Sequence, residues 1–445
     1  MLLRTCILIV LVLPLRLWSQ VDGDGAETGN DPQMQSRMLI PPPVNGQAYP
    51  TIPDSRVRSN YLETGLTFSS AYSDNVLAGS ASTPISDTSY SIWPTIALDE
   101  TMPRLHSVLT YSPGFTFYQR TSARNEMDQN AAADFEYRLS PHVTASLRDS
   151  LQKTSSVFNQ PDLTSAGFVY GSPQSATVAV IAPLAGQLNN KLNVELTYQF
   201  SASDMVGASG MLTDLHYSDP AEVVGLYDSS SRGGSFFYTR RLSARHYLGT
   251  SYEYSRIMAY PTGGQSQTET HTLLAFYSFY VKPSLSFSLA GGPQRANSSE
   301  FPLFTFGSWS PALAASIGWE GQHTTFAAGF SRMITGGGGL VGAFHSNTAN
   351  VSARWLLART WSIGSTASYA MYDTFTPFLA FAEPGGHTAF GTASLQHQLS
   401  EHLDLELGYT RLHQDYSAIS AISRNPDANR EFFSISYQFN RPLGR

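Results

Sequence analysis

The sequence predicts an all-β protein folded as a single transmembrane antiparallel β-barrel of about 18 strands. Stretches of about ten to thirteen residues alternate between apolar and polar side chains, as in residues 192–200 and 403–409. Two such stretches meet at a tight polar turn, a longer link follows, and the unit recurs roughly every forty residues. Because side chains alternate across a strand, each stretch has an apolar face for lipid and a polar face for a lumen.

The composition agrees with this fold class and excludes others. Charged residues make up 14% of the 445 residues, below the roughly 25% of soluble domains, while aromatic residues reach 12%. After the first twenty residues no apolar run approaches the ~18 residues that a spanning helix needs. The net charge of −7 gives no reason to expect a nucleic-acid partner.

The first 19 residues resemble a secretory signal peptide. Arg4 supplies a basic start, an apolar run follows to residue 15, and cleavage after Ser19 is expected. An uncleaved anchor or a buried strand is the alternative. Cys6, the single cysteine, lies in this segment, so the mature chain would contain none. A closed barrel has no need of a disulfide.

Residues 20–58 are polar and rich in proline, which cannot donate to a β-ladder. We expect a disordered periplasmic segment here, with insertion into the lumen as the alternative. The barrel is expected over residues 59–440, and residues 441–445 form a short C-terminal tail.

Turns and links fix the predicted number of strands. The short turns are expected at residues 99–103, 139–142, 201–204, 242–244, 281–284, 320–322, 358–359 and 400–401. The longer links are expected at residues 74–86, 119–128, 153–186, 218–233, 259–267, 293–309, 335–344, 373–386 and 414–428. Short periplasmic turns alternating with long outer links imply 18 strands and two periplasmic termini.

Two regions leave sixteen strands open as an alternative. Pro94 interrupts the second expected strand. Residues 177–181 are apolar and β-branched, and they suit either a strand of the outer link or a segment folded inward as a constriction. Whether the link at 153–186 occludes the lumen is left open as well.

A β-propeller or an array of soluble β-sandwiches would also repeat at about forty residues. A propeller blade divides its repeat among four short strands and carries Gly-His and Trp-Asp landmarks. Here two strands of about ten or more residues occupy each unit, and those landmarks are missing from the sequence. The barrel is therefore preferred.

Charged side chains on the predicted strands determine which face of each strand points to the water-filled lumen. An Arg at the midplane of the lipid face costs on the order of 2–4 kcal/mol, so the charged faces must point into the lumen. Such residues either set a transverse field that selects solutes or pair with one another and stiffen the wall. The predicted lumen-facing charged residues are Glu136, Arg138, Arg148, Glu195, Arg245, Glu253, Arg354, Asp404 and Glu406.

Aromatic residues near the strand ends predict girdles at the two headgroup levels. The expected girdle residues are Trp93, Tyr111, Tyr118, Tyr198, Tyr217, Tyr252, Trp319, Trp355, Trp361, Tyr369 and Tyr409. Arginine far outnumbers lysine. This excess would suit acidic sugars or lipopolysaccharide phosphates, although a composition bias of the source genome would produce the same ratio.

The sequence contains no motif that indicates catalysis. Histidines are scattered singly, and no HExxH, CxxC or phosphate-binding glycine loop occurs. Residues 336–339 are four glycines, which we interpret as a flexible outside loop. We therefore expect no enzyme activity, no cofactor and no metal.

The last predicted strand carries the most specific local pattern. Phe433, Ile435, Tyr437 and Phe439 alternate outward and end in an aromatic residue, as in terminal strands that the barrel-assembly machinery recognises. Here six further residues, 440–445, follow the aromatic.

Together, the Pro-rich lead segment, the Tyr-Ser-Asp-Asn-Val loop at residues 72–76 and the closing Tyr-x-Phe-x-Arg-Pro-Leu at 437–443 resemble outer-membrane β-barrel porins of Gram-negative bacteria. The resemblance covers most of the chain from Tyr61 onward. It implies an integral outer-membrane location, and some members of such families accompany exopolysaccharide export machinery.

The expected function is therefore passive diffusion of small hydrophilic solutes through a polar, mixed-charge lumen. A secretion conduit for an anionic polysaccharide, guided by Arg148, Arg245 and Arg354, is the first alternative. A non-conducting barrel that displays its loops is the second. Expected partners are outer-membrane lipid and lipopolysaccharide, the barrel-assembly machinery, small polar solutes or polysaccharide, and a second copy of the chain in a homo-oligomer.

Overall fold

The computed structural model describes most of the chain from Asn60 onward. Its described residues are 60–76, 83–122, 125–154, 186–218, 225–261, 264–282, 284–300, 304–337, 340–374, 385–416 and 427–443. The expected signal peptide, the Pro-rich segment, residues 177–181 and most of the link at 153–186 lie outside these residues. No helix in the described part is long and apolar enough to cross a membrane.

Strands account for nearly all of the described chain. They are β1 (Tyr61–Ser73), β2 (Asp87–Thr101), β3 (Leu105–Tyr118), β4 (Glu126–Ser140), β5 (Val143–Thr154), β6 (Gln187–Gln199), β7 (Asp204–Tyr217), β8 (Ser229–Arg241), β9 (His246–Ala259), β10 (Ser266–Lys282), β11 (Leu285–Glu300), β12 (Phe304–Glu320), β13 (Thr324–Gly337), β14 (Leu340–Ala358), β15 (Trp361–Thr374), β16 (Gly386–Gln398), β17 (Leu403–Tyr416) and β18 (Asp427–Pro442).

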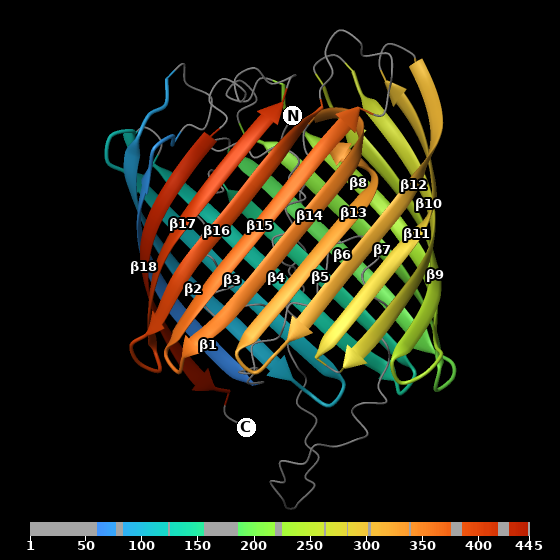
Figure 1. Ribbon diagram of the computed structural model, residues 1–445, viewed down its shortest axis with the longest axis horizontal. Helices are drawn as coiled ribbons and strands as arrows, with labels where there is room; N and C mark the ends of the chain where they lie inside the picture. Colours follow the sequence, from blue (N-terminus) through green and yellow to red (C-terminus); the bar gives the residue numbers. More distant parts are fainter. Residues whose placement is uncertain are drawn as a thin grey trace, which may run out of the picture. The chain divides into compact units, whose positions relative to one another are not determined.

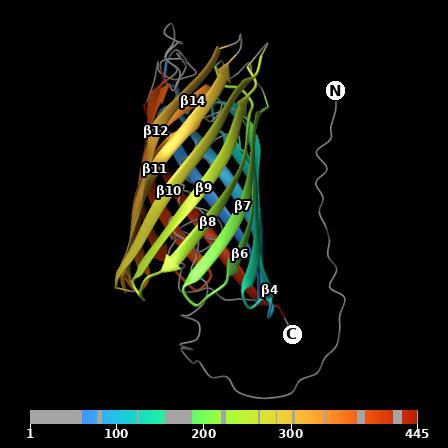
Figure 2. The same ribbon diagram turned by 90° about the vertical axis from the view of Figure 1, so that its right-hand side faces the viewer.

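Each strand pairs antiparallel with its neighbours along the chain, and β1 pairs with β18 to close the sheet. The predicted 18-strand barrel is confirmed, and the sixteen-strand alternative is wrong. The strands run strongly tilted around the barrel, and the short turns gather at the end where β18 finishes (Figure 1, Figure 2).

All eight predicted short turns are found, at residues 102–104, 141–142, 200–203, 242–245, 283–284, 321–323, 359–360 and 399–402. Two of the predicted long links are largely wrong. β11 continues to Glu300 and β12 starts at Phe304, so most of 293–309 is strand. β13 and β14 likewise take up almost all of 335–344.

Exposure alternates along the strands as the sequence pattern predicts. On β18 the side chains of Phe433, Tyr437 and Phe439 are exposed on the outside, whereas Ser434 between them is buried. Hydroxyl pairs line the inner face, such as Thr268 with Ser298 at 2.9 Å across β10 and β11. Asp149 is a charged exception: by its register opposite Leu192 on β6, it shares the outer face of β5.

Most of the predicted girdle residues lie on the outside. Tyr111, Tyr198, Tyr252, Trp319, Trp355, Trp361, Tyr369 and Tyr409 are all exposed. The prediction is wrong for Trp93, Tyr118 and Tyr217, which are buried. These three occupy inward positions of their strands, and a ring pointing inward packs against other residues of the lumen rather than against headgroups.

Inward aromatic rings lie over glycines of the adjacent strand. Gly207 on β7 is directly opposite Phe237 on β8, and a Cβ added at Gly207 would lie 2.1 Å from the ring. The same relation joins Gly249 to Phe276 and Gly408 to Phe432. A ring placed flat over a glycine covers backbone that has no side chain of its own.

The seam between the first and last strands is held at both ends by an asparagine. At the outer end, Asn429 donates to both carboxylate oxygens of Asp74, each at 2.7 Å. At the other end, the backbone carbonyl of Asn60, which has a positive φ of 67°, accepts from Leu443 N at 2.8 Å across the seam, and its side chain accepts from Thr101 N of β2 at 3.0 Å. These bonds fix the register of closure.

A glycine substitution tests the aromatic packing. In Gly207→Ala the new methyl group collides with the Phe237 ring, so unfolding should become easier by about 1–3 kcal/mol. The measurement is the urea midpoint of the heat-modifiable band on gels run without boiling. Gly210→Ala, on the same strand with nothing within 4 Å of the added Cβ, is the matched control. Equal midpoints for the two variants would rule out the packing role.

Candidate functional site: the lumen and its inner hairpin

The inner face of the barrel is the candidate site. Eight of the nine predicted charged residues occupy strand positions that alternate with exposed apolar residues, so they lie on the inner face. For example, Glu136 and Arg138 flank the outward Tyr137 on β4. The others are Arg148 on β5, Glu195 on β6, Glu253 on β9, Arg354 on β14, and Asp404 and Glu406 on β17.

The expected wall position of Arg245 is wrong. The residue lies in the exposed turn between β8 and β9, where its backbone N–H donates to the Ser243 hydroxyl at 3.2 Å. The turn is one residue longer than the sequence pattern predicts, and β9 begins only at His246.

Three of the predicted residues come together on β4, β5 and β6. Arg148 forms an ion pair with Asp134 at 3.1 Å. Glu136 and Glu195 are both in register with Ser146, one on each side of β5. The sequence left open whether the wall charges select solutes or pair with one another. For Arg148 the ion pair with Asp134 supports pairing.

Carboxylates outnumber cations on the inner wall below the outer rim. The carboxylates are Glu63, Asp99, Asp134, Glu136, Glu195, Glu253, Asp404 and Glu406. The cations are Arg138, Arg148, Lys191, Arg241 and Arg354. A lumen with this balance presents a net negative potential to solutes that enter it.

β13 separates from β12 in the outer half of the barrel. The two strands pair only as far as Leu313 and Arg332. β11 stays paired with β12 up to Phe304, and β13 stays paired with β14 up to Leu340. We call residues 333–337 of β13 and 340–344 of β14 the inner hairpin.

Proline explains where the two strands part. Pro293 on β11 and Pro311 on β12 are directly opposite within a continuous ladder. Because proline has no N–H, this pair must be a non-hydrogen-bonded one, and the missing donors point to β10 and β13. The β10–β11 pairing is interrupted at Pro293, and the β12–β13 pairing ends two residues from Pro311.

The outer-facing side of the inner hairpin packs against the inner face of the adjacent strands β11 and β12. Ile334 and Ala343 are buried against Ala296 of β11 and Phe306 of β12, both of which point inward. The backbone of Gly336 approaches Ile257 on β9 so closely that an added Cβ would lie 2.8 Å from it. The hairpin therefore lies within the lumen, on the inner side of β9, β11 and β12.

Gln294 replaces the ladder bonds that β13 loses. Its side chain, 3% exposed, accepts from the backbone N–H of Ile334 at 2.7 Å and donates to the carbonyl of the same residue at 3.5 Å. Backbone groups two residues apart on a strand point to the same side. Arg332 is the last residue of β13 that pairs with β12, so the N–H and C=O of Ile334 face the side from which β12 has separated. One amide side chain thus satisfies both groups.

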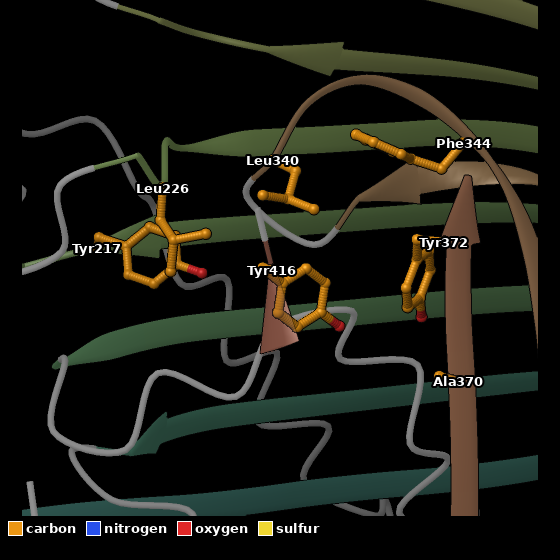
Figure 3. Packing of buried hydrophobic residues seen from close by; sticks show 7 residues of the cluster. All are labelled: Tyr217, Leu226, Leu340, Phe344, Ala370, Tyr372 and Tyr416. Carbon is orange, nitrogen blue, oxygen red and sulfur yellow. The ribbon is translucent and has the colours of Figure 1, made fainter. Parts of the chain in front are cut away.

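The other side of the inner hairpin packs on an aromatic cluster. Leu340 and Phe344 contact Tyr217 of β7 and Leu226 of the following link, together with Ala370 and Tyr372 of β15 and Tyr416 of β17. Figure 3 shows Leu340 between Leu226 and Phe344, with the tyrosines beside them. The cluster joins elements from separate parts of the wall, so the hairpin narrows the outer half of the lumen.

This arrangement corrects the interpretation of residues 336–339 as an outside loop. Gly336 and Gly337 belong to β13 and Gly336 is packed inside the barrel. The sequence signals that were missed are Pro311, which ends a ladder, and Gln294, a large polar side chain at an inward position. Within the described residues, no three His, Cys, Asp or Glu side chains converge as metal ligands would.

No protein family and no curated protein matches the sequence. Among solved structures, OpdQ of Pseudomonas aeruginosa is 9% identical, with a TM-score of 0.43, covering 86% of this chain and 100% of its own. OpdK of the same organism, solved with vanillate, is 10% identical, with a TM-score of 0.40 over 85% and 99% of the two chains. The FrpB iron transporter of Neisseria meningitidis is 9% identical, with a TM-score of 0.41 over 86% and 83%.

The barrel itself determines where the protein resides. Its outer face exposes large apolar side chains on every side, including Leu289 at 60%, Leu407 at 60% and Trp355 at 56%. Aromatic rings accompany them, and the ladder is closed by β1 and β18. It is an outer-membrane β-barrel. Such an exterior is stable in lipid and not in water.

Removing the Gln294 side chain should loosen the inner hairpin. In Gln294→Leu the N–H and C=O of Ile334 are left unpaired, at about 1–3 kcal/mol for each buried group. We expect a larger or more strongly fluctuating single-channel conductance in planar bilayers. Gln396→Leu, an inward-facing Gln on β16 away from the hairpin, is the control.

A disulfide provides the converse experiment. Ala296→Cys together with Ile334→Cys joins two residues of one buried cluster, and oxidation should hold the hairpin against β11. Conductance should then be low and steady, and a reductant should reverse the effect. If neither Gln294→Leu nor the disulfide changes the current, the hairpin does not limit passage.

Proposed function

We propose that the protein is an outer-membrane pore for passive diffusion of small hydrophilic solutes. The observation that supports this most strongly is the closed ladder of 18 strands whose inner face is lined with hydroxyl, amide and charged side chains. A closed barrel satisfies its backbone in lipid, and a polar inner face provides a path for water.

The inner hairpin limits the size of what passes in this proposal. It is buried on both sides, with Ile334 at 3% and Phe344 at 0% exposure, and it lies in the outer half of the lumen. A solute from outside meets this constriction before it reaches the charged wall of β4, β5 and β6. A narrow passage of low conductance fits this arrangement better than a wide, unselective one.

The charge of the wall favours cations and zwitterions over anions. Of the three arginines expected to guide an anionic polysaccharide, Arg148 is paired with Asp134 and Arg245 lies in a turn. Arg354 lies on the wall as expected, and carboxylates outnumber cations there. The polysaccharide conduit therefore has little support, and diffusion of small solutes is preferred.

The outer face of β18 supports a second, separate proposal about assembly. Phe433, Tyr437 and Phe439 expose their rings there, and Ile435 lies between them on the same face. We propose that this row is read by the barrel-assembly machinery. The strand runs on to Pro442, so the signal lies inside the last strand rather than at its end.

Planar-bilayer recording of the purified protein tests the pore. We expect discrete current steps and, in a salt gradient, a reversal potential that indicates cation preference. Glu136→Gln with Glu195→Gln removes two inner carboxylates and should shift the reversal potential toward zero, because the lumen then attracts cations less strongly. Asp149→Asn, an outward carboxylate on β5, is the matched control and should change nothing.

Each outcome has a defined meaning. An absence of current steps from folded protein would reject the pore and favour a barrel that only displays its loops. Current with anion preference would retain the pore and reject the role of the carboxylates. An effect of Asp149→Asn equal to that of the inner variants would show that the lumen does not set the selectivity.

A further inference from the structure

Two arginines are directly opposite each other on the outside of the barrel. Arg232 of β8 and Arg256 of β9 are register partners, near the end where the long links lie. Like charges at directly opposite positions of an antiparallel pair are about 5 Å apart at Cβ, and they destabilise the sheet. A bound anion would remove that repulsion.

Carboxylates of the protein neutralise this pair only in part: Glu269 of β10 is directly opposite Arg256, and Asp214 of β7 is diagonal to Arg232. Among the described residues, neither Arg232 nor Arg256 takes part in an ion pair. Glu269 accepts a hydrogen bond from Gln267 at 3.1 Å and keeps its negative charge next to Arg256. Arg256 donates through one terminal nitrogen to Gln267, and its Nε is buried without a partner.

A third arginine extends the positive surface. Arg295 on β11 is exposed and lies over the ring of Trp309 at 5.8 Å from its centroid. Arg295 is the register partner of His271 on β10, whose ring bonds the hydroxyl of Tyr252 at 2.8 Å. We call Arg232, Arg256 and Arg295 the arginine patch.

Aromatic side chains place the arginine patch at the level of the headgroups. Tyr252 on β9 and Trp309 on β12 are exposed beside it, at 44% and 65%. Amphipathic rings favour the boundary between hydrocarbon and headgroups. The patch thus faces the phosphates of the outer leaflet rather than bulk water or acyl chains.

The opposite side of the barrel provides a contrast. Arg411 of β17 is also exposed near an outer strand end, but it forms an ion pair with Asp427 of β18 at 3.1 Å. His413 bonds the same carboxylate at 3.2 Å. The exterior arginines therefore differ: Arg411 is paired with a carboxylate, whereas Arg232, Arg256 and Arg295 form no ion pair among the described residues.

We propose that the arginine patch binds the phosphates of the outer-leaflet glycolipid, lipopolysaccharide. The planar guanidinium fork matches a phosphate in a bidentate manner, and two opposed forks can hold one phosphate group between them. Arg295, with Trp309 beneath it, contacts the same headgroup or its neighbour. The bound lipid covers the outer ends of β8 to β12, next to the point where β12 and β13 separate.

Lipid A binding to the full chain, purified in detergent, tests the proposal. Native mass spectrometry would measure binding of bisphosphorylated and dephosphorylated lipid A. The wild type should bind the bisphosphorylated form at least about tenfold more tightly, and Arg232→Gln with Arg256→Gln should remove that difference. Arg240→Gln, at the other end of β8 on the same face and near Asp204, should bind like the wild type.

A lysine variant, a folding control and competition by phosphate distinguish this site from a general charge effect. Arg232→Lys with Arg256→Lys keeps the charge without the fork and should retain part of the affinity, and heat-modifiable migration verifies folding of each variant. Equal binding of the two lipids by the wild type, or unchanged binding by the Gln variant, would overturn the proposal. Competition by inorganic phosphate at the concentration of the lipid would identify a free-phosphate site instead and would overturn it as well.

Discussion

Hydrogen bonding of the backbone is the constraint on which the whole structure depends. Within hydrocarbon there is no water to satisfy an unpaired N–H or C=O, so a sheet can cross a membrane only if it closes on itself. Here β1 pairs with β18 along its entire length, from Tyr61 to Ser73, and no edge is left at the seam. The side-chain alternation that the sequence displays is the consequence of this closed ladder lying between lipid and water.

The exceptions to the ladder are as informative as the rule. Pro94 interrupts the β2–β3 pairing between Ile92 and Ile96, and the strand continues because β1 pairs with it throughout. Pro311 has a larger effect, since β13 leaves β12 altogether beyond it. The separated backbone does not stay unpaired: Gln294 bonds the strand from inside, and packing on both sides holds it there.

Local patterns in the sequence predicted the parts of the fold that are set locally. Alternation placed the strands, polar turns placed the hairpins, and the cost of charge in lipid oriented Glu136 and Arg148 correctly. The features that depend on contacts between residues far apart in the sequence were not predicted. The residues that flank Trp93 in the sequence do not distinguish it from an outward girdle aromatic, yet its side chain points inward over Gly114. The inner hairpin needs contacts with β7, β11 and β17, far apart in sequence, and no window of the chain contains them.

The asparagine bonds at the seam have a consequence for biogenesis. Asp74 and Asn429 are 355 positions apart and meet only after the final strand has been made. A slip of one residue at that junction would turn the hydroxyl-rich side of β1 toward acyl chains and would also separate the two partners. A misaligned closure would therefore lose both Asn429–Asp74 hydrogen bonds together with the side-chain alternation, so the observed register is the more stable one.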